Sequence, residues 1–141
     1  MRKKISIRTL LVAVLSLISG AAWAGTTQVV VQWVGKDWSG LSGEQIFDVQ
    51  GKLDDLGTKY GFDSDGNDVG GGAANFYLYV DDKRVDQVVR EIVDTQKKGL
   101  LPDGMRIGIA VYKDKARKDW VYKVAYPNTL KHFDITYHEK N

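Results

Sequence analysis

The order in which strand-like and helix-like stretches follow one another constrains the fold of this chain more than any other feature. β-branched or alternating stretches predict strands at 28–34, 75–80, 105–112 and 120–126. Apolar residues recur every three or four positions in 46–56 and again in 85–93, which predicts two helices. Two helices among these strands, with an adjacent strand pair between the helices, predict an α+β fold built from split β-α-β units.

Residues that start and stop helices flank the first helical stretch. Ser42 stands three residues before Gln45, which is the spacing of a capping box. Gly57 or Gly61 is expected to end the helix, because glycine tolerates the left-handed conformation common at helix C-termini. The Asp- and Gly-rich stretch that follows predicts a turn with a bulge, and a short edge strand at 60–63.

The second helical stretch has similar boundaries. Asp81 or Asp82 can cap its N-terminus, and Gly99 is expected to end it. The order strand, helix, strand pair, helix, strand is that of a ferredoxin-like βαββαβ two-layer sandwich, in which two helices cover one face of an antiparallel sheet. The stretches 120–126 and 133–137 extend this core as an appended C-terminal β-hairpin, and the alternative for 133–137 is a frayed chain end.

The N-terminal residues have the pattern of a cleavable secretory signal. Basic residues at 2–4 precede an apolar block at 10–18, and small residues follow up to Ala24. The apolar block is shorter than the roughly 20 residues that a transmembrane helix needs. We therefore expect cleavage of residues 1–24, export to the periplasm or beyond with no stable membrane anchor, and a single domain over 25–141.

Loss of the signal would change the charge of the protein. The chain carries 20 basic and 18 acidic side chains, and four of the basic ones lie in 1–24, so residues 25–141 have a net charge of −2. A near-neutral domain lacks the basic field of proteins that bind nucleic acid or anionic lipid. The chain has no cysteine, which excludes disulfides, a thiolate nucleophile and Cys-based zinc sites, so stability has to come from a hydrophobic core.

The acidic stretch from Asp63 to Gly72 is one candidate for cation binding. Asp63, Asp65 and Asp68 offer the oxygen ligands that calcium prefers. Their spacing differs from that of an EF-hand, because Ala74 stands where the bidentate glutamate belongs. A turn built by Asp, Asn and Gly residues is the other interpretation.

The two histidines are the other candidate for metal binding. His132 and His138 lie near Asp134 and Glu139, so a metal site or an acid–base pair can be drawn in the C-terminal segment. Solvated histidines on a polar segment are the alternative. Residues 25–141 contain no phosphate-binding glycine loop, G-x-S-x-G or S-x-x-K motif, so the sequence predicts no catalytic residue and no cofactor.

The sheet face turned away from the helices is the strongest candidate for binding. By alternation this face carries Gln32, Asn75, Tyr77, Tyr79, Arg106 and Tyr112, with Trp120 and Tyr122 beside them. Tyr, Trp and Arg are enriched at the centres of protein interfaces. We expect a protein partner or a homodimer there. The alternative is that the C-terminal hairpin or a second subunit simply covers the face.

The middle of the chain resembles a group of small, uncharacterised bacterial proteins. The shared motif, D-G-x-D-x-G-x-G-x-x-N, runs from Asp65 to Asn75, leads into a predicted strand and is followed by a valine-rich helix. The resemblance implies a ferredoxin-like core and no particular activity.

These observations lead to two hypotheses. The first is an exported, non-catalytic binding protein, such as an immunity-type inhibitor of a toxin, that holds its partner with the aromatic sheet face or with the stretch 63–72. The second is a small-molecule or metal-binding module centred on the three aspartates or on the two histidines.

Overall fold

The computed structural model describes residues 25–34, 42–70 and 72–136. Its elements are β1 (Thr26–Val34), α2 (Gly43–Tyr60), β2 (Asp63–Gly70), β3 (Ala73–Asp81), the 3₁₀ turn η2 (Asp82–Arg84), α3 (Val85–Lys97), β4 (Met105–Tyr112) and β5 (Trp120–Tyr126). The expected α+β class is confirmed. The expected signal, 1–24, lies outside the described residues. No helix within the described ranges is long and apolar enough to span a membrane.

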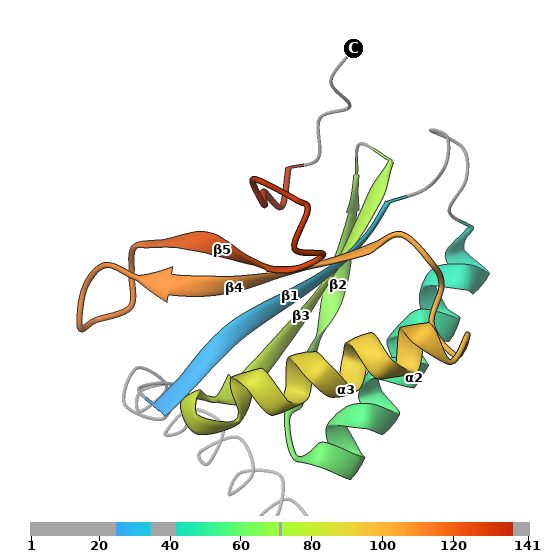
Figure 1. Ribbon diagram of the computed structural model, residues 1–141, viewed down its shortest axis with the longest axis horizontal. Coiled ribbons are helices and arrows are strands. Elements are labelled where there is room, and N and C mark those ends of the chain that lie inside the picture. Colours follow the sequence, from blue (N-terminus) through green and yellow to red (C-terminus); the bar gives the residue numbers. More distant parts are fainter. Residues whose placement is uncertain (1–24, 35–41, 71, 137–141) are drawn as a thin grey trace, which may run out of the picture.

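The five strands form one antiparallel sheet in the order β2-β3-β1-β4-β5. Helices α2 and α3 cover one face, and the segment that follows β5 lies on the opposite face (Figure 1). The fifth strand pairs with β4. The appended hairpin of 120–126 with 133–137 does not form over the described residues, because only 120–126 is a strand. With this strand the order differs from that of a simple four-stranded ferredoxin-like sheet.

The hydrophobic core lies between the helices and the face of the sheet that they cover. Val29 and Val31 of β1 point into this core, as predicted, and Trp33 packs against it while half-buried. The neighbouring strands and the helices contribute Phe76, Leu78, Val80, Ile107, Ile46, Val49, Leu53, Val88 and Ile92. Apolar burial of this kind stabilises a fold by about 25 cal/mol per Å² of area removed from water.

The predicted capping box opens α2. The backbone N–H of Gln45 donates to Ser42 Oγ at 3.2 Å, and the backbone N–H of Ser42 donates to Gln45 Oε1 at 3.0 Å. Gly61, with φ of 77°, ends the helix, whereas Gly57 lies within it. A Cβ at position 57 would lie 2.6 Å from the Phe62 carbonyl oxygen, so the glycine is needed for this close approach.

The expected edge strand at 60–63 was wrong in its extent. Strand β2 begins at Asp63 and pairs with β3 as far as Gly70, and it contains the expected bulge, between Ser64 and Asn67. Polar residues are compatible with this strand because it lies at the sheet edge and its side chains bond to α2. Gln50 Nε2 donates to Ser64 Oγ at 2.7 Å, and Asn67 Nδ2 donates to Gln50 Oε1 at 2.8 Å.

The expected last strand at 133–137 was also wrong over its described part. Residues 133–136 have no regular secondary structure, and Tyr137 lies outside the described residues. These residues, which we call the C-terminal strap, cross the sheet face opposite the helices (Figure 1). Side-chain contacts from the sheet hold this segment, and it does not pair with a strand through backbone hydrogen bonds.

Candidate functional site

The sheet face opposite the helices, called the outer face below, collects most of the residues singled out in the sequence. Strands β1, β3, β4 and β5 place on it Gln28, Val30, Gln32, Asn75, Tyr77, Tyr79, Arg106, Gly108, Tyr112, Trp120 and Tyr122. Asp68 joins them from β2, opposite Asn75. The face has two parts, one beneath the C-terminal strap and one that the strap leaves open.

Two buried carboxamides hold the strap. Gln32 Nε2 donates to the Asp134 carbonyl oxygen at 2.8 Å, and Asn75 Nδ2 donates to the Ile135 carbonyl oxygen at 2.9 Å. Gln32 Nε2 also donates to Asn75 Oδ1 at 3.0 Å. These side chains are only 1% and 4% exposed, so the strap satisfies polar groups that would be costly to leave unpaired. The predicted site residue Asn75 is therefore part of the covered region.

An aromatic contact fixes the start of the strap. The Phe133 ring packs on the backbone of Gly108, and a Cβ at that glycine would overlap the ring. The ring also meets Tyr122 edge-on, with centroids 5.6 Å apart. Phe133 is consequently buried, although it lies outside any strand.

The open part is built around a group of three phenols, which we call the tyrosine cluster: Tyr79, Tyr112 and Tyr122. All three bond to Gln28. Its Nε2 donates to the Tyr79 hydroxyl oxygen at 3.2 Å, its Oε1 accepts from the Tyr122 hydroxyl at 2.6 Å, and its backbone N–H donates to the Tyr112 hydroxyl oxygen at 3.0 Å. Burial raises the pKa of Tyr122. These bonds hold half-buried aromatic rings in fixed positions beside the exposed Trp120, which meets Tyr112 edge-on.

A second group of polar contacts lies at the β2 side of the outer face. The Tyr77 hydroxyl donates to Asp68 Oδ2 at 2.7 Å, and Asn75 Nδ2 donates to Asp68 Oδ1 at 2.9 Å. Two effects raise the pKa of Tyr77. The larger is burial of the phenol, and the second is its hydrogen bond to the Asp68 carboxylate. Tyr77 is thus held protonated, as a donor to the carboxylate.

Arg117 fastens the β4–β5 hairpin tip to the rest of the molecule. Its guanidinium donates to the Thr26 carbonyl oxygen, lies 3.0 Å from Asp82 Oδ2 and stacks over the Tyr112 ring at 4.6 Å. Partial burial opposes ionisation of Asp82, but hydrogen bonds from Thr27 and Arg117 outweigh it and lower the pKa of that carboxyl. Arg117 adopts this position with a φ of 56°, which is uncommon for a residue other than glycine.

Gln28, Asp82 and Arg117 were not among the site residues expected from the sequence, where Asp82 was expected only as a possible helix cap. Gln28 stood out only as one polar residue of a strand, and its three bonds depend on the register of β1 with its neighbours. Arg117 lies among the charged residues of a turn, where nothing in the spacing indicates a partner 35 residues earlier in the chain.

The acidic candidate residues do not gather into a cation site. Asp63 and Asp68 lie on the outer face of β2, and exposed Asp65 lies in the bulge between them. The described ranges contain no group of three His, Asp or Glu side chains that could hold a metal ion. His132 is exposed, while His138 and Glu139 lie outside the described residues.

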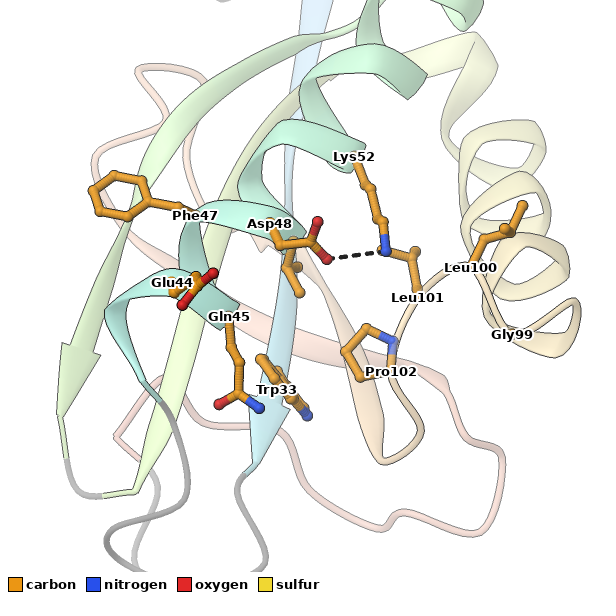
Figure 2. A pocket seen from close by; sticks show the side chains of 11 residues that line it. Trp33, Glu44, Gln45, Phe47, Asp48, Lys52, Gly99, Leu100, Leu101 and Pro102 are labelled. Carbon is orange, nitrogen blue, oxygen red and sulfur yellow. Dashed lines mark ion pairs between the residues drawn. The ribbon is translucent and has the colours of Figure 1, made fainter.

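A groove on the helix side was not anticipated from the sequence. It has a volume of about 770 Å³ and runs between the first turns of α2 and the α3–β4 connection, with Trp33 at its base and Leu101 and Pro102 along one wall (Figure 2). An ion pair between Lys52 Nζ and Asp48 Oδ2, at 2.9 Å, lies at its α2 side. Phe47 also lines the groove at its outer rim, and its exposed ring points away from the other lining side chains (Figure 2).

Comparisons of this chain with protein families, with curated proteins and with solved structures find no match.

Proposed function

We propose that this protein is an exported, non-catalytic binding protein that holds a protein partner on the open part of its outer face. The tyrosine cluster carries this proposal. Its three phenols are held by hydrogen bonds to Gln28, so little side-chain entropy would be lost on binding. Rigid, half-buried Tyr and Trp side chains provide large amphipathic contact areas and are enriched among the residues that dominate binding energy.

The outer face already holds one segment without regular secondary structure, which supports its use as a binding surface. The C-terminal strap is bound through its backbone carbonyl groups by Gln32 and Asn75 and through an aromatic anchor, Phe133. A partner would extend this mode of contact over Tyr79, Tyr112 and Trp120. An immunity-type inhibitor that blocks a toxin is one concrete form of this function, because inhibition requires only a rigid complementary surface.

We further propose that the fold is a ferredoxin-like sandwich extended by one strand, and that residues 25–141 act in the periplasm after removal of 1–24. The order β2-β3-β1-β4, its antiparallel pairing and the placement of one helix after β1 and one after β3 support the fold. The charged, apolar and small-residue regions of 1–24 support the location.

Site-specific photo-crosslinking in the periplasm of the native host tests the binding surface. A photoreactive amino acid placed at Tyr112 should give a discrete adduct with the partner. The same amino acid at Phe47, which is 77% exposed in the helix layer, should give none and serves as the matched control. Replacing Tyr79 with alanine should reduce the Tyr112 adduct several-fold, because an aromatic contact beside the probe is lost.

Four outcomes would count against the proposal. Equal labelling from both positions would show that the outer face has no preferred partner, and absence of any adduct would have the same meaning. An adduct between two copies of this chain would identify a homodimer instead of a separate partner. A rise in melting temperature on addition of calcium or zinc would favour the metal-binding alternative, because a ligand that binds only the folded state stabilises it.

A further inference from the structure

The two edges of the sheet differ in how well they are protected from pairing with another strand. At one edge β2 is interrupted by a bulge and carries Asp63, Asp65 and Asp68, which are features that keep natural edge strands from pairing with other chains. At the other edge β5 pairs only with β4 among the described strands. Because backbone groups of alternate residues point to opposite sides of an antiparallel strand, half of those in β5 face outward.

An apolar patch lies next to the open β5 edge. Val111 and Val121 face each other across the β4–β5 pair, on the helix side of the sheet. They are 45% and 49% exposed because the hairpin projects beyond the ends of the helices (Figure 1). A strand added to β5 would bury part of this surface in addition to pairing the backbone.

Lysines surround the same edge. Residues 113–132 carry six basic and two acidic side chains. Both acidic groups are engaged within the hairpin turn, where Asp114 Oδ1 accepts from the Lys118 and Asp119 backbone N–H groups and the Asp119 carboxylate lies 3.9 Å from Lys113 Nζ. Lys118 and Lys123 make no ion pair with the described part of the chain. The edge therefore presents uncompensated positive charge.

We propose that β5 accepts an extended, acidic strand of a partner protein, which adds to the sheet by β-augmentation. A second β5 is a poor occupant, because pairing two copies would bring the Lys118 and Lys123 side chains of both copies together. The acidic β2 of a second copy has suitable charge, but its bulge interrupts the ladder after Ser64. An acidic strand without a bulge satisfies both the backbone and the charges.

The side chains of β5 also indicate the order of residues in such a strand. Val121 and Lys123 are two positions apart and project from the same side of the sheet. The added strand should therefore place an apolar residue opposite Val121 and an acidic residue opposite Lys123, so that these two residues are also two positions apart. Tyr122 of the tyrosine cluster also belongs to β5, but it projects onto the outer face, whereas Val121 and Lys123 project on the helix side. The inference concerns the backbone edge and these helix-side residues, and it goes beyond the function proposed above.

Titration of the mature chain with a synthetic capped peptide that repeats Val-Thr-Glu-Thr tests this inference by NMR. The backbone amides of 120–126 should shift, and those of Gln28 and Tyr79 should shift less. A peptide with lysine in place of glutamate and a peptide with proline in place of each valine should bind more weakly. Lys123→Glu should weaken binding of the glutamate peptide about two- to fivefold, and the change of both Lys118 and Lys123 to Glu about tenfold, as expected for partly exposed ion pairs.

Lys97→Glu is the matched control, because it makes the same charge change at an exposed residue of α3, away from β5. Equal binding of the glutamate and lysine peptides, or equal loss in Lys97→Glu and Lys123→Glu, would overturn the inference. Chemical shifts of the β5 amides that change with protein concentration in the absence of peptide would also overturn it, because they would identify a second copy of the chain as the occupant. Tyr79→Ala should leave peptide binding unchanged. If peptide binding fails while crosslinking at Tyr112 persists, the edge proposal is wrong and the function proposed above stands.

Discussion

At the central strand β1, the two faces of the sheet are buried to a similar depth but by different means. In β1, Val29 and Val31 are covered by helices, and Val30 and Gln32 on the outer face are equally inaccessible. The helix side is closed by apolar side chains from two regular elements. The outer face is closed over Gln32 by a segment without regular structure, through hydrogen bonds to backbone carbonyl groups.

This difference separates stability from specificity within one sheet. Apolar burial has little directionality, so the helix side stabilises the whole domain and tolerates substitutions of similar shape and volume. Amide hydrogen bonds require fixed geometry and add less net free energy. The cover on the outer face should therefore be a local feature that can be lost while the rest of the domain stays folded.

The largest effect is expected on the helix side. Leu78→Ala removes a fully buried side chain of β3 and should lower the free energy of unfolding by about 2–5 kcal/mol, through lost burial and the cavity that remains. Urea denaturation should show one cooperative transition at a lower midpoint. Val69→Ala, at an exposed residue of β2, is the control and should change the midpoint little. Similar losses in both variants would contradict the assignment of the core.

A smaller effect is expected where the Phe133 ring meets the sheet. Gly108→Ala places a methyl group where the ring lies and should cost about 1–3 kcal/mol, the usual range for overpacking. In a Phe133→Ala background the same glycine change should cost much less, since the opposing ring is absent. A double-mutant cycle measures this coupling. Additive effects would show that the ring does not rest on this glycine.

The sequence predicted the fold where local rules act alone. The capping box at Ser42 follows from residues close together in the chain and is confirmed. Of the two glycines expected to end the helix, Gly57 and Gly61, the second does so. The alternation in β3 and β4 likewise determines which side chains meet the helices. The extent of β2 was not predicted, because its Asp, Gly and Asn residues favour turns and form a strand only when β3 and Gln50 supply partners.

The outer face was predicted as a set of residues but not as an arrangement. Alternation identifies Tyr77, Tyr79 and Tyr112 as members of one face, but it carries no information about what covers that face. The strap is held by Gln32 and Asn75 across 102 and 60 residues of sequence. Contacts at such separations depend on the complete sheet and have no local signal, which is why residues 133–136 were predicted to form a strand.

The third prediction separates the cover from the core. Asn75→Ala removes the donor to the Ile135 carbonyl oxygen and also the hydrogen bonds to Gln32 and Asp68. It should cost about 1–2 kcal/mol, because the released Ile135 carbonyl can be hydrated once the strap moves and Gln32 keeps its bond to the Asp134 carbonyl. Hydrogen exchange should accelerate in the strap and stay slow in β1. Asn67→Ala is the matched control, because it removes a side-chain hydrogen bond from Asn67 Nδ2 to Gln50 Oε1 on the helix side. It should leave the strap protected from exchange. Faster exchange throughout β1 would mean that the two faces unfold as one unit.

The smallest effect concerns the Tyr77–Asp68 pair on the outer face. The pKa of Tyr77 is raised in the folded state, first by burial and then by the Asp68 carboxylate. The folded protein therefore holds this proton more tightly than the unfolded chain does. The resulting stabilisation is complete below the ordinary tyrosine pKa of about 10 and declines as the pH rises above that value.

Asp68→Asn keeps an oxygen that can accept the Tyr77 hydroxyl bond but removes the negative charge. The Tyr77 pKa should fall toward its ordinary value without reaching it, since burial persists, and the alkaline loss of stability should become shallower. An NMR titration of the Tyr77 ring carbons measures the pKa directly. Asp63→Asn, on the same strand and face, is the control for the change in net charge. An unchanged Tyr77 pKa in Asp68→Asn would mean that burial alone sets it, and that the polar contacts at this side of the outer face contribute nothing to its electrostatics.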